Sequence, residues 1–200
     1  MKKVFYITTF FLMLLIGAYN SKTENNVNQT QKEAINSREV SYNDLILNQL
    51  EGVWYYQNTP YNGFSVKYYN TGAVAERLGF TNGKRQGIGK RWSEKGALRS
   101  QFIYEQNRLV GIYKSWWDNG QLASKANYEN GVLNGTQTEW YDTGRLAKKR
   151  ELASGKEEGM QQAWLPNGKI YINYEARNGR NFGLKRANLC YQLKDEILQK

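Results

Sequence analysis

Side chains that could do covalent chemistry or bind a metal are scarce in this sequence. Its 200 residues contain no His and a single Cys, Cys190. Without His there is no Ser–His–Asp or Cys–His nucleophile system and no His-ligated metal, and one Cys cannot form an intramolecular disulfide. Asp118 and Asp142 stand in predicted turns, where an Asp caps its own loop. We therefore expect a non-catalytic protein with no cofactor and no metal site.

The charge of the chain is strongly positive. Lys and Arg number 28 against 18 Asp and Glu, giving a net charge of +10, which attracts acidic partners. The basic residues are interleaved with acidic ones along the chain. This pattern argues against a nucleic-acid partner, whereas an anionic polymer, a membrane surface, or simply a solvated basic exterior fits it.

The N-terminus has the pattern of an export signal. Lys2-Lys3 precede an apolar run from Val4 to Ile16, which ends at Gly17-Ala18. The run is shorter than the roughly 20 residues of a membrane span, so we expect a signal peptide over 1–21, with an uncleaved anchor as the alternative. Tyr19 occupies the place where a lipoprotein signal needs Cys. The predicted location is therefore periplasmic or associated with the cell envelope, without a lipid anchor.

Residues 22–39 are polar and lack aromatic side chains. Such a segment buries too little apolar surface to offset its chain entropy. We expect it to be a disordered polar linker.

The rest of the chain is dominated by a 24-residue repeat. Its marker is a glycine at Gly63, Gly87, Gly111, Gly135, Gly159 and Gly183. Five residues after each of the first five glycines stands an aromatic residue: Tyr68, Trp92, Trp116, Trp140 and Trp164. Nine residues after comes a second glycine, and eleven after comes an aliphatic residue: Val74, Leu98, Leu122, Leu146 and Ile170.

Each repeat has the pattern of a β-hairpin. The second glycine suits a type I turn closed by a residue with positive φ, which would set each aromatic opposite its aliphatic. A second turn is expected near Gly83, Asn107, Gly131, Gly155 and Gly179. Alternation then predicts one buried face, carrying in the second repeat Ile88, Trp92, Leu98, Phe102 and Tyr104. One repeat cannot bury enough to stand alone, so neighbours must stack.

These patterns predict an all-β fold, an elongated antiparallel β-meander of 24-residue hairpin repeats over 40–185. The segment Val53-Trp54-Tyr55-Tyr56 looks like the second half of a further repeat. Residues 186–200 lose the pattern and are expected to form a C-terminal cap, as either strand or helix. Open sheet edges allow pairing with a second copy of the chain.

A candidate interaction surface lies one position after the aromatic of each repeat. Tyr69, Trp117 and Tyr141 form this stripe, interrupted by Ser93. We expect these aromatics to be exposed beside Arg91, Arg99, Lys125 and Lys149, a combination that suits a protein surface, a glycan or an anionic headgroup. Incidental packing between neighbouring repeats explains the stripe equally well. The Trp residues at 92, 116, 140 and 164 are better explained as hairpin packing than as a sugar-stacking ladder.

The repeat unit resembles the bacterial variant of the MORN repeat. Its pattern is a glycine, four residues, an aromatic, three residues, a second glycine, one residue and an aliphatic. The resemblance is clearest from Gly111 to Leu122 and from Gly135 to Leu146. It implies an elongated, twisted meander without a compact core, serving as a protein-interaction or membrane-proximal scaffold. The lead-in Val40-Ser41-Tyr42-Asn43-Asp44-Leu45 is similar to that of exported proteins labelled YwqK-type antitoxin.

From residues and resemblance together we expect an exported, non-catalytic scaffold that binds an unknown protein in the cell envelope. The alternatives are a polysaccharide- or cell-wall-binding module and an antitoxin-like neutralising protein. The antitoxin alternative implies a cytoplasmic partner, which conflicts with the export signal.

Overall fold

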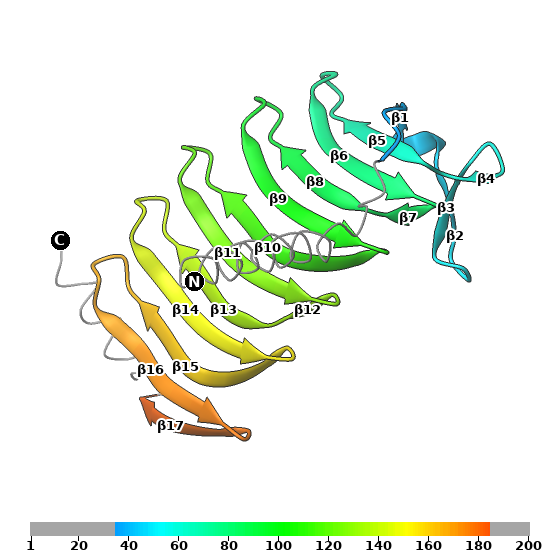
Figure 1. Cartoon of the computed structure of the whole chain (residues 1–200). Helices are drawn as coiled ribbons and strands as arrows, with labels where there is room; N and C mark the ends of the chain where they lie inside the picture. The colour runs from blue at the N-terminus through cyan, green and yellow to red at the C-terminus, as the bar shows by residue number, and fades with distance from the viewer. Residues whose placement is uncertain (1–34, 185–200) are drawn as a thin grey trace, which may run out of the picture. The chain divides into compact units, whose positions relative to one another are not determined.

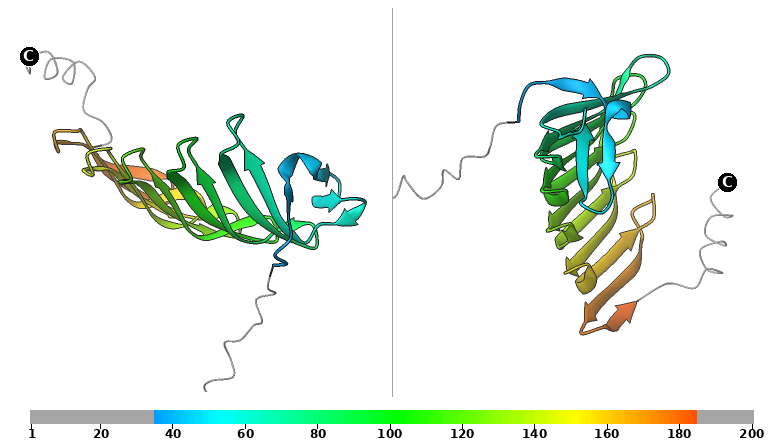
Figure 2. Two further views of the ribbon diagram at one scale, coloured as in Figure 1. Left: turned by 90° about the horizontal axis from the view of Figure 1, so that it is seen from above. Right: turned by 90° about the vertical axis from the view of Figure 1, so that its right-hand side faces the viewer.

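The computed structural model describes residues 35–184, and these fold almost entirely into β-structure (Figure 1). Fourteen strands form one large sheet, and three form a small second sheet. The predicted all-β class is confirmed, and successive hairpins lie side by side along the large sheet (Figures 1 and 2). Within the described residues, no helix has the length and hydrophobicity needed to cross a membrane.

The large sheet follows the chain with few exceptions. Its order is β1 (Glu39–Ser41), β5 (Gly63–Tyr68), β6 (Val74–Thr81), β8 (Gly87–Trp92), β9 (Leu98–Glu105), β10 (Arg108–Trp116), β11 (Leu122–Glu129), β13 (Gly135–Trp140), β14 (Leu146–Ala153), β15 (Lys156–Trp164), β16 (Ile170–Arg177) and β17 (Arg180–Leu184). The short strands β7 (Lys84–Arg85) and β12 (Val132–Leu133) pair with β6 and β11. All these pairings are antiparallel except that of β1 with β5, which is parallel.

Both predicted turns recur in every repeat. The first turn ends on a glycine with φ between 79° and 88° at Gly72, Gly96, Gly120, Gly144 and Gly168. The second turn has two consecutive residues with positive φ, as at Asn130 (51°) and Gly131 (85°), which is the type I′ geometry that matches the twist of a hairpin. Asn107 adopts φ of 71° where the other repeats have glycine, as expected for a residue that tolerates the left-handed region.

The aromatic of each repeat pairs with the predicted aliphatic in all five hairpins. The pairs are Tyr68–Val74, Trp92–Leu98, Trp116–Leu122, Trp140–Leu146 and Trp164–Ile170. These rungs are half-buried or exposed, and none is among the fully buried residues. The expectation of a buried ladder of indole and leucine side chains is therefore wrong in degree, because the sheet is one layer thick along most of its length.

A β-bulge follows each of these pairs and corrects the predicted faces. Trp92 pairs with Leu98, but Arg91 pairs with Ser100, so Arg99 is an extra residue on its strand. A one-residue shift moves every later side chain to the other face. Ile88 consequently lies opposite Ile103 rather than with Phe102, and it is 50% exposed. The expected grouping of Ile88 with Phe102 and Tyr104 is wrong for this reason.

We name the two faces of the large sheet after residues that lie on them. The tyrosine face carries Tyr104, Tyr113 and Tyr128, with Phe102 stacked on Tyr113 at 6.1 Å between ring centroids. The lysine face carries Lys90, Lys114, Lys125 and Lys149.

Among residues 35–184, the hydrophobic core cluster lies at the N-terminal end of the large sheet. There the small sheet, β2 (Ile46–Asn48), β3 (Val53–Tyr56) and β4 (Thr59–Pro60), follows the 3-10 turn η2 (Tyr42–Asp44). The core consists of Leu45, Trp54, Tyr61, Leu78, Phe80 and Phe102. The resemblance implied no compact core, and it failed here because Val53–Tyr56 forms a separate sheet instead of a further hairpin of the array.

The boundaries of the folded part differ from the expected ones at the N-terminal side. The carbonyl of Arg38 accepts hydrogen bonds from the Phe64 amide at 2.7 Å and from the Tyr61 hydroxyl at 3.1 Å. The end of the expected linker, 35–39, therefore already belongs to the fold. The predicted signal peptide, the rest of the linker, Cys190 and the C-terminal cap lie outside the described residues.

Candidate functional site

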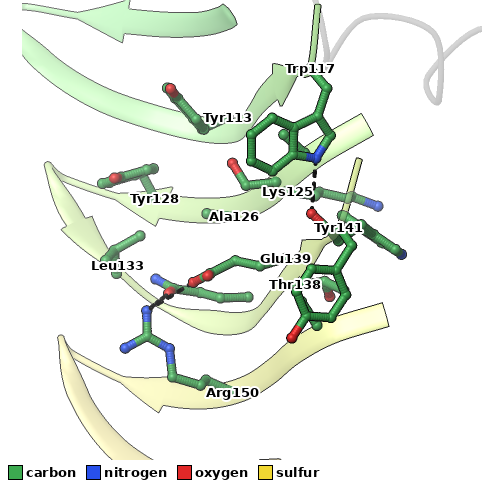
Figure 3. A pocket seen from close by; sticks show the side chains of 15 residues that line it. Tyr113, Trp117, Lys125, Ala126, Tyr128, Leu133, Thr138, Glu139, Tyr141 and Arg150 are labelled. Carbon is green, nitrogen blue, oxygen red and sulfur yellow. Dashed lines mark hydrogen bonds and ion pairs between the residues drawn. The ribbon is translucent and has the colours of Figure 1, made fainter. Parts of the chain in front are cut away.

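A groove of about 580 Å³ lies on the tyrosine face, across β10, β11, β13 and β14 (Figure 3). Its aromatic lining comes from Tyr113, Trp117, Tyr128, Trp140 and Tyr141. Its polar lining includes Gln137, Glu139 and Arg150. Mixed aromatic and polar linings of this kind are typical of binding sites.

The position of the groove follows from the bulges. The extra residue of the bulge is Ala123 in the hairpin of β10 and β11, and Ala147 in the hairpin of β13 and β14. Both line the groove. In the preceding and following hairpins the same position carries Arg99 and Tyr171. Two adjacent small residues therefore leave room that large side chains occupy in the hairpins on either side.

The aromatic wall at one side of the groove is continuous with the N-terminal core. Tyr113 stacks on Phe102 with 10° between the ring planes, and Tyr128 meets Tyr113 edge to face at 6.3 Å. Burial raises the pKa of the Tyr128 hydroxyl above its ordinary value, and the neighbouring Tyr113 and Tyr104 add to the effect. The hydroxyl of Tyr128 therefore stays protonated and can donate a hydrogen bond at neutral pH.

The polar floor of the groove is incompletely hydrogen-bonded. Arg150 Nη2 donates to Gln137 Oε1 at 2.9 Å and lies 3.6 Å from Glu139 Oε1. Gln137 is only 6% exposed, yet its Nε2 has no hydrogen-bond partner among the described residues, and neither has Arg150 Nε. A buried unpaired donor costs about 1–3 kcal/mol, so a small adjustment of Gln137 that gives it a partner would be favourable.

The predicted aromatic stripe serves as a connection between repeats. The side chains of Tyr69, Trp117 and Tyr141 donate to the backbone carbonyls of Trp92, Trp140 and Trp164, at 2.8, 2.9 and 2.7 Å. Each bond joins one repeat to the next. At the interruption, Ser93 Oγ instead accepts from the Ala97 amide in its own turn at 3.2 Å. Trp117 is nevertheless 38% exposed, so it lines the groove and joins two repeats at once.

Replacing Tyr141 by Phe is expected to lower the free energy of unfolding by about 1 kcal/mol, because the bond to the Trp164 carbonyl is lost while the ring stays. Urea unfolding followed by circular dichroism measures the change. Tyr68→Phe is the control, since the Tyr68 ring is 53% exposed and its hydroxyl makes no hydrogen bond within residues 35–184. Equal stability of the two variants would show that the inter-repeat bond contributes nothing.

Of the four predicted cations, Lys125 lines the groove together with Trp117 and Tyr141, and the other three do not (Figure 3). Arg91 lies on the tyrosine face, with its Nε 2.5 Å from Glu76 Oε2 and its guanidinium over Phe102. Arg99 pairs with Asp118 in the turn of the next repeat. Lys125 and Lys149 project from the lysine face, each directly opposite Thr138 on a neighbouring strand. The bulge again explains the division, because it separates residues that simple alternation puts together.

Sequence reasoning missed the groove residues Tyr113, Tyr128, Gln137 and Arg150. One signal could have found Gln137. The position two residues after the repeat glycine is buried in four of the five repeats. It holds Gly89 and three polar residues, Ser65, Gln137 and Gln161, which are exposed by 2%, 6% and 2%. Polar side chains at a buried position need partners. Among residues 35–184, no group of three or more Asp, Glu, Cys or His side chains is placed to hold a metal ion.

The repeated hairpins define an all-β repeat protein, and a comparison with known families gives the repeat a name. Residues 109–130 match the model of the MORN repeat variant, so the chain carries a MORN repeat there. The match covers β11 and all but the first residue of β10, the hairpin that supplies Tyr113, Trp117 and Tyr128 to the groove. No curated protein matches the chain. The similarity to YwqK-type antitoxins stays a prediction.

Proposed function

We propose that this protein is a non-catalytic repeat scaffold that binds a protein partner through the groove on its tyrosine face. The observation that carries the proposal is the groove itself, where Trp117 is exposed beside Tyr141 and the Gln137–Arg150 pair. Trp, Tyr and Arg are the side chains that contribute most binding energy at protein interfaces. The MORN repeat over 109–130 agrees with a binding role.

The array supplies a rigid support for such a site. The groove is built on four neighbouring strands, and the bonds from Trp117 and Tyr141 fix the repeats against each other at its rim. A partner would therefore meet side chains that are already ordered, which lowers the entropic cost of binding.

Site-specific crosslinking in the producing cell tests the proposal. A photoreactive residue at position 117 should give a defined crosslinked protein, identified by mass spectrometry. The same residue at position 69, which makes the equivalent inter-repeat bond outside the groove, should not give that product. The same product from both positions, or none from position 117, would refute the groove as the binding site.

The cellular location in this proposal is the envelope, and it is supported by the charged and apolar pattern of residues 1–21. Fractionation of cells that express the full chain tests it. Protein found in the cytoplasm with an intact N-terminus would exclude export and would favour the antitoxin-like alternative, which needs a cytoplasmic partner.

A further inference from the structure

The lysine face carries one uninterrupted row of directly opposed residues that crosses the sheet at right angles to its strands. From β8 to β16, each member pairs with the next in register: Lys90, Gln101, Lys114, Lys125, Thr138, Lys149, Gln162 and Asn173. We call Lys90, Lys114, Lys125 and Lys149 the lysine row. Neighbouring strands lie about 4.8 Å apart, so the lysine row extends over about 24 Å.

The amines of the lysine row are uncompensated. Within residues 35–184 none of the four forms an ion pair, and the members between them are amides or a hydroxyl. Lys114 lies directly opposite Lys125, an arrangement of like charges that destabilises a sheet. Folding alone therefore gives no reason for this row.

The opposite face shows that this array can neutralise its cations. Arg91 pairs with Glu76 at 2.5 Å, and Arg150 lies 3.6 Å from Glu139. Acidic partners occur on both faces, since Arg77, directly opposite Lys90, lies 2.6 Å from Glu39 and Lys148 lies 3.7 Å from Glu139 on the tyrosine face. The lysine row has none among the described residues.

Two half-buried indoles lie beside the lysine row. Trp92 and Trp116 stand two residues after Lys90 and Lys114 on the same strands. Successive residues of a strand alternate between faces, so these indoles share the lysine face. A ligand lying along the row would meet amines, amides and a hydroxyl on one side and aromatic surface on the other.

We propose that the lysine face binds a strand of acidic polysaccharide that runs along the row, across the β-strands. The amines would pair with its acidic groups, Gln101, Thr138 and Gln162 would hydrogen-bond its hydroxyls, and the indoles would pack against the apolar faces of its sugar rings. A linear ligand with regularly repeated negative charge matches a linear row of cations, and hydroxyls along its length match the neutral polar members. Lys125 and Thr138 also border the groove, so the two sites adjoin at β11 and β13. The groove lining does not include Lys90, Gln101, Lys114, Lys149 or Gln162.

Affinity electrophoresis of the full chain tests the proposal, with polygalacturonate in the gel as the acidic polysaccharide and dextran as the neutral one. The protein should be retarded by polygalacturonate and not by dextran. The double variant Lys114→Gln/Lys125→Gln should bind polygalacturonate about five- to tenfold more weakly. The control Lys95→Gln/Lys156→Gln removes the same charge outside the row and should leave retardation unchanged.

A second comparison separates a polysaccharide from other anions. Trp116→Leu keeps an apolar side chain against Leu122 but removes the stacking surface, and it should weaken binding of polygalacturonate without changing the residual binding of polyglutamate. Equal binding of polyglutamate, phosphatidylglycerol vesicles or DNA by the unaltered protein would overturn the assignment to polysaccharide. An equal loss of polygalacturonate binding in the Lys95→Gln/Lys156→Gln control would show that binding depends on the net charge of the protein and not on the lysine row. If no partner is crosslinked from position 117 but polygalacturonate is still bound, the proposal for the groove fails and the proposal for the lysine row is retained.

Discussion

Replacing Phe80 by Ala is expected to lower the free energy of unfolding by about 3–5 kcal/mol. Phe80 is 0% exposed, and its ring contacts Trp54 at 6.1 Å and Tyr61 at 5.7 Å between centroids. These rings join the small sheet to the large one. Because the rest of the array is one layer thick, no comparable set of fully buried rings exists elsewhere in residues 35–184. Loss of the Phe80 ring should therefore destabilise the packing of the small sheet against the N-terminal end of the large sheet.

Urea unfolding measured by both circular dichroism and Trp fluorescence tests this expectation. Ile112→Ala is the matched control, since Ile112 also lies in the large sheet but is 40% exposed, and its cost should stay below about 1 kcal/mol. Equal losses in the two variants would contradict a core confined to the N-terminal end. A midpoint that differs between the two signals would indicate that the core and the array unfold separately.

The turns and the cross-strand pairs could be predicted because they depend on local chemistry that is repeated five times. A glycine where φ must be positive, and an aromatic set opposite an aliphatic by that turn, need no knowledge of distant residues. Trp92–Leu98 and Trp116–Leu122 are paired as expected for this reason. The match of one hairpin to the MORN repeat variant rests on the same local pattern.

The faces could not be predicted because one extra residue per hairpin reverses them. Arg99 and Ala123 look like ordinary strand residues in the sequence, yet each is the extra residue of a bulge. The groove depends on the same detail, since it opens where that residue is Ala in two neighbouring repeats. Sites that depend on a register shift need coordinates, whereas sites that depend on spacing do not.

The charge pattern illustrates the same limit. Along the chain, basic and acidic residues are interleaved apart from short basic runs such as Lys148-Lys149-Arg150. The strand register decides which charged residues become neighbours, and it places Lys114 directly opposite Lys125. Residues adjacent in the sequence point to opposite faces of the sheet. The lysine row is therefore a property of the sheet, which explains why composition alone left both an anionic ligand and a solvated surface open.

Replacing Gly83 by Ala is expected to lower the free energy of unfolding by about 3 kcal/mol or more. Gly83 has φ of 71°, and a Cβ there would lie 2.4 Å from Val53 Cγ1 and 2.7 Å from the Trp54 carbonyl oxygen. Its amide also donates to the Tyr61 carbonyl, and its carbonyl accepts from the Trp54 amide. A methyl group at this point would push the small sheet away from the hairpin turn on which it rests.

The repeat itself supplies the control that separates backbone strain from this collision. Gly131 occupies the same turn position with φ of 85°, but a Cβ there would meet nothing closer than Arg108 Cβ at 3.9 Å. Asn107 already has φ of 71° at the equivalent position, so a side chain in this conformation is tolerated, and Gly131→Ala should cost only about 1 kcal/mol. Urea unfolding of the two variants measures the difference, and equal losses would show that positive φ, rather than contact with the small sheet, requires glycine at position 83. The larger loss of stability expected for Gly83→Ala than for Gly131→Ala follows from tertiary packing. The two turns have the same local conformation, and the small sheet packs against the turn at Gly83.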